Sequence, residues 1–185
     1  MQILNIAREL LLYYAISGEV IIIVLISACL LGVNCKYDGK NNLNDRIVEY
    51  FKGKNIIPVC PEQLGGLSTP RLSSEIKDGD GQDVLEGTTK IMNNKGNDVT
   101  EQFIKGAYET LKLAQISGAT RAVLKARSPS CGVGEIYNGD FNGILIEGDG
   151  VATALLKSKG IEVYNDEDFL FYIDEQNSRE DICND

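Results

Sequence analysis

Three short apolar runs dominate the hydrophobic pattern of this chain. The first spans residues 21–28 and consists mostly of β-branched residues, and the others span residues 55–59 and 121–126. Continuous apolar runs of this length are typical of strands that are buried on both faces, as in a parallel sheet. We therefore predict that these three runs form parallel strands.

The segments between these runs have the three- and four-residue apolar spacing of helices. Residues 41–53 begin with asparagines and end in glycine, and residues 98–118 begin with Asp98 or Thr100 as a cap and end in glycine. Residues 151–160 have the same spacing. Because predicted strands alternate with predicted helices, the fold class is α/β, with a small parallel sheet flanked by helices.

The remaining segments complete a single domain. Residues 61–82 are rich in Gly, Pro and Ser and are too long for a plain connector, so we expect a functional loop there. We predict a small hairpin at residues 84–95 and irregular or hairpin structure at residues 132–150. A fourth short strand at residues 161–164 and a closing element at residues 167–172 follow.

The two ends of the chain are predicted to lie outside this domain, which spans residues 20–173. Residues 1–19 form an N-terminal extension. This extension is either a native segment, helical over residues 3–16 and packed on the flank of the sheet, or a non-native start ahead of Val20. Residues 174–185 form an acidic tail, which we expect to be frayed.

A hydropathy scan also raises a membrane interpretation for residues 10–33. Within them, residues 26–29 resemble a bacterial lipoprotein cleavage box with Cys29 as the lipidated residue. However, Glu19 interrupts the apolar core, and the unbroken run at residues 20–28 is much shorter than the ~20 residues of a membrane span. We therefore expect no membrane partner and a cytoplasmic protein.

Composition narrows the function classes. The 185 residues carry a formal net charge of −9, which argues against nucleic acid or an anionic membrane as a partner. The chain contains no histidine, which excludes Ser-His-Asp and Cys-His nucleophile systems and any His-ligated metal. Proton transfer must therefore fall to carboxylate, Cys, Lys or Tyr side chains.

Three of the five cysteines, Cys29, Cys60 and Cys131, each follow one of the three predicted strands. Because parallel strands place their carboxyl ends at one edge of the sheet, where ligands bind, we expect these thiols to share one site. An odd number of cysteines spread along the chain does not fit a disulfide framework, so we expect reduced thiols.

Residue chemistry leaves three interpretations of such a thiol cluster open. In the first, the thiols are buried small hydrophobes. In the second, they hold structural zinc, although such sites usually use two close pairs, and here the close pair is Cys29 and Cys35. In the third, they hold an iron–sulfur cluster, which accepts thiolates from distant loops and, with three protein ligands, leaves one iron open as a Lewis acid.

Polar side chains next to two of these cysteines have both structural and chemical interpretations. Glu62, two residues after Cys60, is either a solvated loop carboxylate or a proton-transfer group beside whatever Cys60 binds. Ser128 and Ser130 are either turn residues around a proline or hydroxyls that orient a substrate or water beside Cys131.

Several motifs, taken together and in this order, resemble the thiouracil desulfidase family over residues 20–164. The motifs are SACLLG at 27–32, YDG at 37–39, VCPEQLGG at 59–66, TPR at 69–71, DVT at 98–100, LK at 124–125 and SPSCG at 128–132. This resemblance implies a bacterial protein with a single Rossmann-like domain whose metal site lies at the C-terminal ends of the strands.

The resemblance further implies a [4Fe-4S] cluster held by Cys29, Cys60 and Cys131, with the fourth iron free to bind the sulfur of a thiolated base. Cys35 is left out of the ligand set because its position varies within the family. Cys183 is interpreted as a spare thiol in the acidic tail.

The catalytic carboxylate of the family corresponds to Glu62 and its serine to Ser128. The implied reaction is a non-redox desulfuration of a thiolated pyrimidine such as 2-thiouracil, giving uracil and sulfide. The open iron polarises the carbon–sulfur bond, Glu62 assists the attack of water, and Ser128 holds the substrate or intermediate. The alternative function is an iron–sulfur or zinc sensor without turnover.

Overall fold

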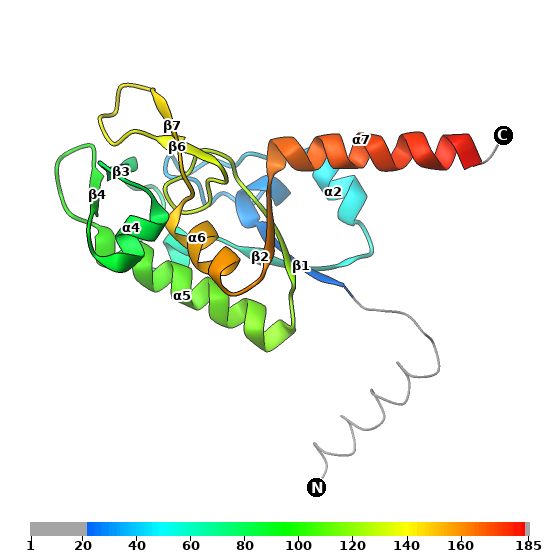
Figure 1. Ribbon diagram of the computed structural model, residues 1–185, viewed down its shortest axis with the longest axis horizontal. Helices are drawn as coiled ribbons and strands as arrows, with labels where there is room; N and C mark the ends of the chain where they lie inside the picture. Colours follow the sequence, from blue (N-terminus) through cyan, green and yellow to red (C-terminus); the bar gives the residue numbers. More distant parts are fainter. Residues whose placement is uncertain (1–21, 184–185) are drawn as a thin grey trace, which may run out of the picture.

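The computed structural model describes residues 22–183, so the predictions for the N-terminal extension lie outside the described residues. Its central strands are β1 Ile23–Ser27, β2 Asn55–Val59, β5 Arg121–Leu124 and β8 Glu162–Asn165. They form one sheet in the order β2-β1-β5-β8, and all neighbouring pairs are parallel (Figure 1). The predicted α/β class with a small parallel sheet is confirmed.

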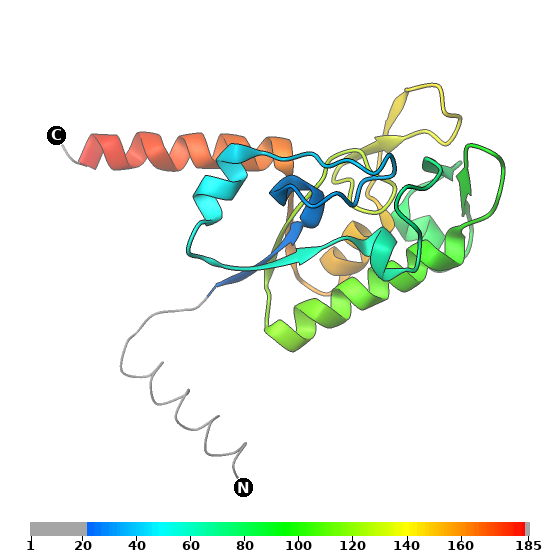
Figure 2. The same cartoon turned by 180° about the vertical axis from the view of Figure 1, so that it is seen from behind.

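Helices cover both faces of this sheet (Figures 1 and 2). Because side chains alternate along a strand, Leu25 of β1 packs in the core that contains Phe103, whereas Val24 packs with Phe169 on the other face. The helical elements are the 3₁₀ turn η1 Ala28–Leu31 and the helices α2 Asp45–Phe51, α3 Pro61–Leu64, α4 Gly81–Glu86, α5 Thr100–Ser117, α6 Val151–Ser158 and α7 Asp166–Cys183. The first core thus lies under α5 and α6, and the second under α2 and α7.

The order of the strands creates a ligand-binding position. β1 lies inside the sheet, with β2 on one side and β5 on the other. The chain reaches β2 through α2 and β5 through α5, and these helices pack on opposite faces. A reversal of this kind is a topological switch point, where ligands bind at the carboxyl ends of the strands.

The segment between β2 and α5 differs from its prediction. The prediction of a hairpin at residues 84–95 is wrong, because α4 extends to Glu86 and the next strand pairs with a strand that precedes α4. α4 forms because Asp80 accepts the N–H of Asp83 at 3.2 Å while the Asp83 carboxylate accepts the N–H of Asp80 at 3.0 Å, which is a capping box. The antiparallel pair is β3 Ser74–Lys77 with β4 Lys90–Asn93.

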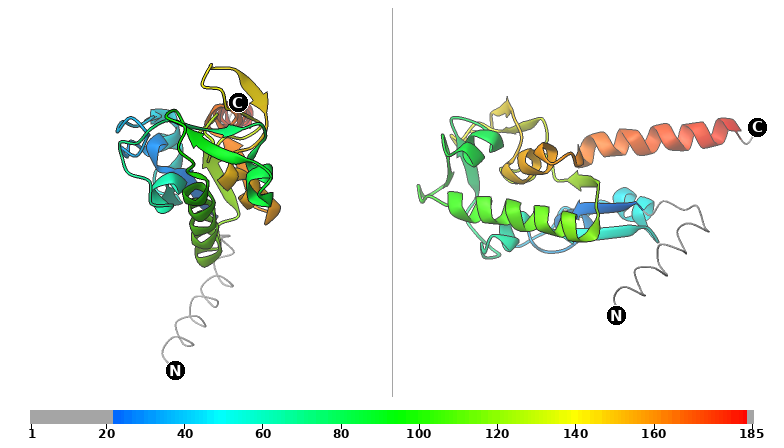
Figure 3. Two further views of the ribbon diagram at one scale, coloured as in Figure 1. Left: turned by 90° about the vertical axis from the view of Figure 1, so that its left-hand side faces the viewer. Right: turned by 60° about the horizontal axis from the view of Figure 1, so that its bottom comes forward.

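The C-terminal part confirms one prediction and corrects another. Residues 132–150 contain a hairpin, in which β6 Glu135–Tyr137 pairs antiparallel with β7 Leu145–Glu147. The tail expected to be frayed is helical instead, since α7 continues to Cys183 and extends away from the domain (Figure 3). No helix among residues 22–183 is long and apolar enough to cross a membrane.

Asp166 connects the start of α7 to the end of β5. The residue is 7% exposed, and its carboxylate accepts hydrogen bonds from Lys125 Nζ at 2.8 Å and from the backbone N–H of Ala126 at 2.7 Å. We expect Asp166→Ala to lower the free energy of unfolding by about 2 kcal/mol, because hydrogen bonds to charged groups contribute ~1.5–3 kcal/mol. Thermal denaturation measures this change.

Glu167→Ala is the matched control for this prediction. The Glu167 carboxylate pairs with Arg127 at 2.7 Å but is 47% exposed. Exposed pairs contribute less than about 1 kcal/mol, so the melting temperature should change much less than in Asp166→Ala. Equal shifts in the two variants would show that Asp166 makes no special connection.

Candidate metal centre

Cys29 lies in the turn that directly follows β1. At the end of the strand, Ser27 Oγ accepts a hydrogen bond from the backbone N–H of Lys125 at 3.0 Å, which links the ends of β1 and β5. The turn closes at Gly32, whose φ of 89° is in the left-handed region and whose N–H donates to the Cys29 carbonyl at 3.2 Å. Glycine adopts this conformation readily, so the turn holds Cys29 at the carboxyl end of β1.

Cys60 and Glu62 are fixed by a close contact between two helices. Cys60 is the N-cap residue of α3, and Glu62 lies in the first turn of that helix. A Cβ on Gly106 of α5 would lie 1.9 Å from the carbonyl oxygen of Pro61, and a Cβ on Gly65 would lie equally close to the α5 backbone. Because glycine alone permits this approach, backbone packing sets the position of both functional side chains.

Cys131 is presented by a turn that Ser128 organises. Ser128 Oγ accepts hydrogen bonds from the backbone N–H groups of Ser130 at 3.1 Å and Cys131 at 3.2 Å. Thr153 Oγ1 donates to the Cys131 carbonyl at 3.0 Å. Ser128 therefore acts as a turn residue, and its own hydroxyl hydrogen stays available to donate. Ser130 is fully buried and is not among the residues that line the pocket.

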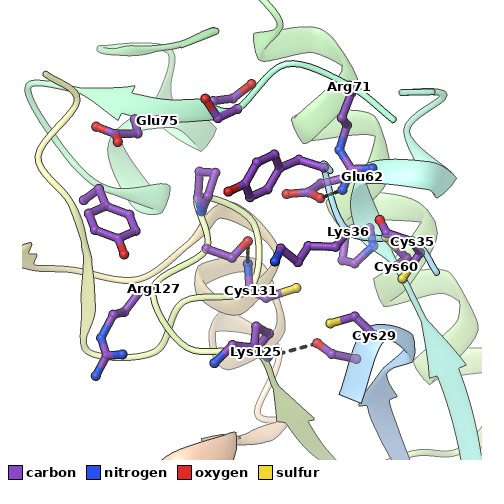
Figure 4. A pocket seen from close by; sticks show the side chains of 18 of the residues that line it. Cys29, Cys35, Lys36, Cys60, Glu62, Arg71, Glu75, Lys125, Arg127 and Cys131 are labelled. Carbon is purple, nitrogen blue, oxygen red and sulfur yellow. Dashed lines mark hydrogen bonds and ion pairs between the residues drawn. The ribbon is translucent and has the colours of Figure 1, made fainter. Parts of the chain in front are cut away.

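A pocket of about 670 Å³ opens at this edge of the sheet. It is lined by all five residues that the family resemblance places in the site, namely Cys29, Cys60, Glu62, Ser128 and Cys131. In Figure 4 the side chains of Cys29 and Cys131 point toward one another, and the Glu62 carboxylate faces the same space. The structure therefore brings residues that are far apart in sequence to the wall of one pocket.

The structure adds a fourth thiol, Cys35, to this pocket. Cys35 is 1% exposed and lies beside Cys60, whose Sγ is 3.7 Å from the Cys35 carbonyl oxygen (Figure 4). Hydrogen bonds with the Cys35 thiol are the main reason that the pKa values of Cys29 and Cys60 are lowered, that of Cys60 to about 7. The same contacts raise the pKa of Cys35. Its place in the loop that follows Cys29 was the sequence signal for this role.

The three expected ligands do not share one protonation state. Burial is the main cause that raises the pKa of the Cys131 thiol, and the negative charge of Glu62 raises it further. The pKa of Cys29 and Cys60 is lowered instead. Metal binding by Cys131 must therefore release a proton, whereas a substantial fraction of Cys60 is already a thiolate at neutral pH.

We expect this difference to appear when the cluster-free chain is alkylated with iodoacetamide under anaerobic conditions. The thiolate is the reactive form, so the Cys60 rate should rise with pH with a midpoint at about 7 and level off at higher pH. Cys131 should stay slow through this range, because its pKa is raised. Mass spectrometry of the labelled peptides reports both rates.

Cys35→Ala provides the control for the alkylation profile. It removes the main cause that lowers the Cys60 pKa, and burial then raises that pKa against the smaller opposing effects of the Gln63 N–H and Arg71. The midpoint for Cys60 should move to higher pH. An unchanged midpoint would show that the Cys35 thiol does not act on Cys60.

Glu62 is paired with an arginine to which the sequence analysis gave no role. The Arg71 guanidinium contacts Glu62 Oε2, and the two side chains are only 6% and 17% exposed. Arg71 belongs to the TPR motif, but its partner lies nine positions earlier in a different element. Sequence spacing therefore gave no sign of the pair, which orients the carboxylate in the pocket.

Three other cations line the pocket and were not predicted. They are Lys36, Lys125 and Arg127. Each forms an ion pair with an acidic residue, at distances between 2.7 and 3.0 Å. Because these charges are already balanced, the pocket suits a neutral substrate better than a strongly anionic one.

The donor set distinguishes between the metal interpretations. Cys29, Cys35, Cys60 and Cys131 are all free cysteines, and thiolates are soft ligands. Within the described part of the chain, no group of three His, Cys, Asp or Glu side chains is close enough to hold one metal ion. Thiolates on different irons of a cluster lie further apart than thiolates on one zinc ion. The spacing is therefore not that of a single zinc site, and the thiol donors are of the type that iron–sulfur clusters use.

The parallel sheet and the pocket lined by four cysteines place this chain in the class of α/β domains with a thiol-lined pocket at the carboxyl ends of the strands. The chain is a member of the 2-thiouracil desulfurase family, whose sequence profile matches residues 24–168. It is 46% identical over 143 residues to the uncharacterized protein YbbK of Bacillus subtilis strain 168, covering 77% of this chain and 95% of that protein.

A solved structure also supports membership of this family. The chain matches the [4Fe-4S]-dependent thiouracil desulfidase TudS with a TM-score of 0.69 and 36% sequence identity. The match covers 79% of this chain and 91% of that chain. Together these similarities confirm the family resemblance that the motifs indicated.

Proposed function

We propose that this chain is an iron–sulfur-dependent desulfidase that removes sulfur from a thiolated pyrimidine such as 2-thiouracil. The observation that carries the proposal is one pocket lined by Cys29, Cys60, Cys131 and Glu62, in a member of the 2-thiouracil desulfurase family. The similarity to a [4Fe-4S]-dependent thiouracil desulfidase supports the same cofactor and the same substrate class.

Cys29, Cys60 and Cys131 are the proposed cluster ligands. They come from three separate turns, and the chain has no histidine to replace any of them. When bound, a cluster with three protein ligands supplies one iron that is open to the substrate sulfur and acts as a Lewis acid. Because cluster ligands must stay reduced, we propose a cytoplasmic location.

Glu62 and Ser128 are the proposed catalytic residues. Arg71 holds one oxygen of the Glu62 carboxylate, and the charged carboxylate can accept a proton from the water that attacks the thione carbon. The Ser128 hydroxyl can donate to the substrate while its oxygen keeps the turn closed. The thione and water give a carbonyl and hydrogen sulfide, so the reaction needs no oxidant or reductant.

The test is anaerobic reconstitution of the full chain with iron and sulfide, followed by incubation with 2-thiouracil. We expect about four irons per chain, and release of uracil and sulfide in equal amounts. A protein that binds the cluster but forms no uracil would contradict the enzyme proposal and support the alternative function of a sensor. Zinc in place of iron would contradict the proposed cofactor. A lipid attached to Cys29 in protein from the natural host would contradict the proposed cytoplasmic location.

A further inference from the structure

The loop between β6 and β7 carries an aromatic residue in an unusual conformation. Phe141 has a φ of 53°, lines the pocket and is 39% exposed. This left-handed region is unfavourable for bulky residues and suits glycine or asparagine. A phenylalanine held in this conformation, with its side chain partly open to the pocket, is a candidate for direct contact with a bound ring.

A buried carboxylate on a different element holds this loop in place. Glu75 of β3 is 9% exposed, and its Oε2 accepts hydrogen bonds from the backbone N–H groups of Gly139 and Phe141, each at 3.0 Å. A buried carboxylate is costly unless it is hydrogen-bonded, and bonds of this charged type are strong. In addition, a Cβ on Gly139 would lie 2.4 Å from the carbonyl oxygen of Ile76. The loop is therefore anchored on β3.

The anchored loop completes an aromatic part of the pocket. Tyr37 and Tyr137 line the same pocket as Phe141. Tyr37 is 47% exposed, whereas the thiol-bearing Cys131 is 6% exposed, so the rings lie nearer the entrance than this thiol. Aromatic faces bind flat rings by offset stacking. The nearby cations are already paired with acidic groups, so stacking on these rings adds recognition of the flat ring to the contacts proposed for its sulfur and for Ser128.

We propose that Phe141 is a specificity-determining residue that stacks on the planar ring of a heteroaromatic thione, and that Glu75 is the positioning residue that holds it there. The inference rests on the proposed desulfidase function and narrows its substrates. Flat heteroaromatic thiones are preferred over saturated cyclic thioureas that carry the same thiocarbonyl group.

The kinetic test compares 2-thiouracil with 5,6-dihydro-2-thiouracil in the cluster-loaded protein. The two compounds share the thiourea unit, but the second has a puckered, saturated ring. Phe141→Ala should lower kcat/KM for 2-thiouracil about tenfold, mainly through KM, because base-on-aromatic stacking contributes an effect of this size. The value for the dihydro compound should change little. Phe141→Tyr should retain the preference.

Glu75 variants test the positioning role. Glu75→Ala releases the loop and should raise KM for 2-thiouracil in the same direction as Phe141→Ala. Glu75→Gln keeps an amide oxygen that accepts from both N–H groups, so it should retain most of the preference. Phe171→Ala is the matched control, since Phe171 is an exposed phenylalanine on α7, away from the pocket lining.

A binding measurement tests whether residue 141 stacks on the ring, and it does not depend on enzymatic turnover. The chain has no tryptophan, so Phe141→Trp introduces a single tryptophan, which can be excited at wavelengths where the tyrosines hardly absorb. Uracil should change its emission saturably and dihydrouracil should not, whereas the same titrations of Phe171→Trp should be flat. If wild-type protein loads a cluster but does not cleave 2-thiouracil, the proposed function fails and this titration still tests stacking. Equal KM changes for the two thiones, or no response of Phe141→Trp to uracil, would overturn the inference.

Discussion

Replacement of Cys131 by serine is expected to reduce the iron content of the reconstituted chain to background. The serine hydroxyl is a harder and more basic ligand than a thiol, and the other two proposed ligands cannot hold a cluster alone. Cys131 is also buried at 6% exposure, so no solvent thiol can easily replace it. Iron and acid-labile sulfide analysis after anaerobic reconstitution measures the loss.

Cys183→Ser and Cys35→Ser are the controls for this result. Cys183 ends α7, which extends away from the sheet, so its replacement should leave the iron content unchanged. Cys35→Ser should also retain iron, because the proposed ligand set does not include Cys35. Full iron content in Cys131→Ser would overturn the three-ligand site, and loss of iron in Cys35→Ser would add a ligand to it.

Glu62→Gln is expected to lower the rate of uracil formation by at least about 100-fold while leaving the iron content intact. A positioned proton acceptor contributes ~10²–10⁴-fold, and the amide cannot accept a proton from water. The fold should be affected as well, because Arg71 is 6% exposed and loses its partner. Breaking a buried ion pair costs about 3–5 kcal/mol, so a lower melting temperature is expected alongside the lost activity.

The double variant Glu62→Gln, Arg71→Gln separates these two effects. It removes both charges, so the melting temperature should recover part of its loss, while turnover should stay abolished. Activity that returns with stability would show that Glu62 supports the fold and does not transfer protons. Activity retained in Glu62→Gln itself would remove Glu62 from the mechanism.

The parts of the site that could be predicted are those that strand order dictates. Cys29, Cys60 and Cys131 each follow an apolar run, and parallel strands end at one edge, so local patterns were sufficient to bring them together. Their approach needed no knowledge of side-chain contacts. The family motifs then added the interpretation of Glu62 and Ser128.

The parts that could not be predicted depend on contacts between elements without a shared pattern. Glu75 accepts hydrogen bonds from a loop that lies 64 to 66 positions further along the chain. Arg71, which lies in a loop, forms an ion pair with Glu62 of α3. The pairing of β3 with β4 was missed because the sequence pattern predicts a loop at residues 61–82 and a hairpin at residues 84–95, whereas Asp80 and Asp83 form a capping box that starts a helix between the two strands. Polar side chains carry no periodicity that would reveal such partners.

The contact between α3 and α5 has a consequence for the motion of the site. Cys60 and Glu62 belong to one short helix that is seated on α5 through Gly65 and Gly106, without flexible side chains in between. Thermal fluctuations should therefore displace the thiol and the carboxylate together, as one rigid body. The separation between the metal-binding group and the proton acceptor is then preserved even when the surrounding loops adjust to different substrates.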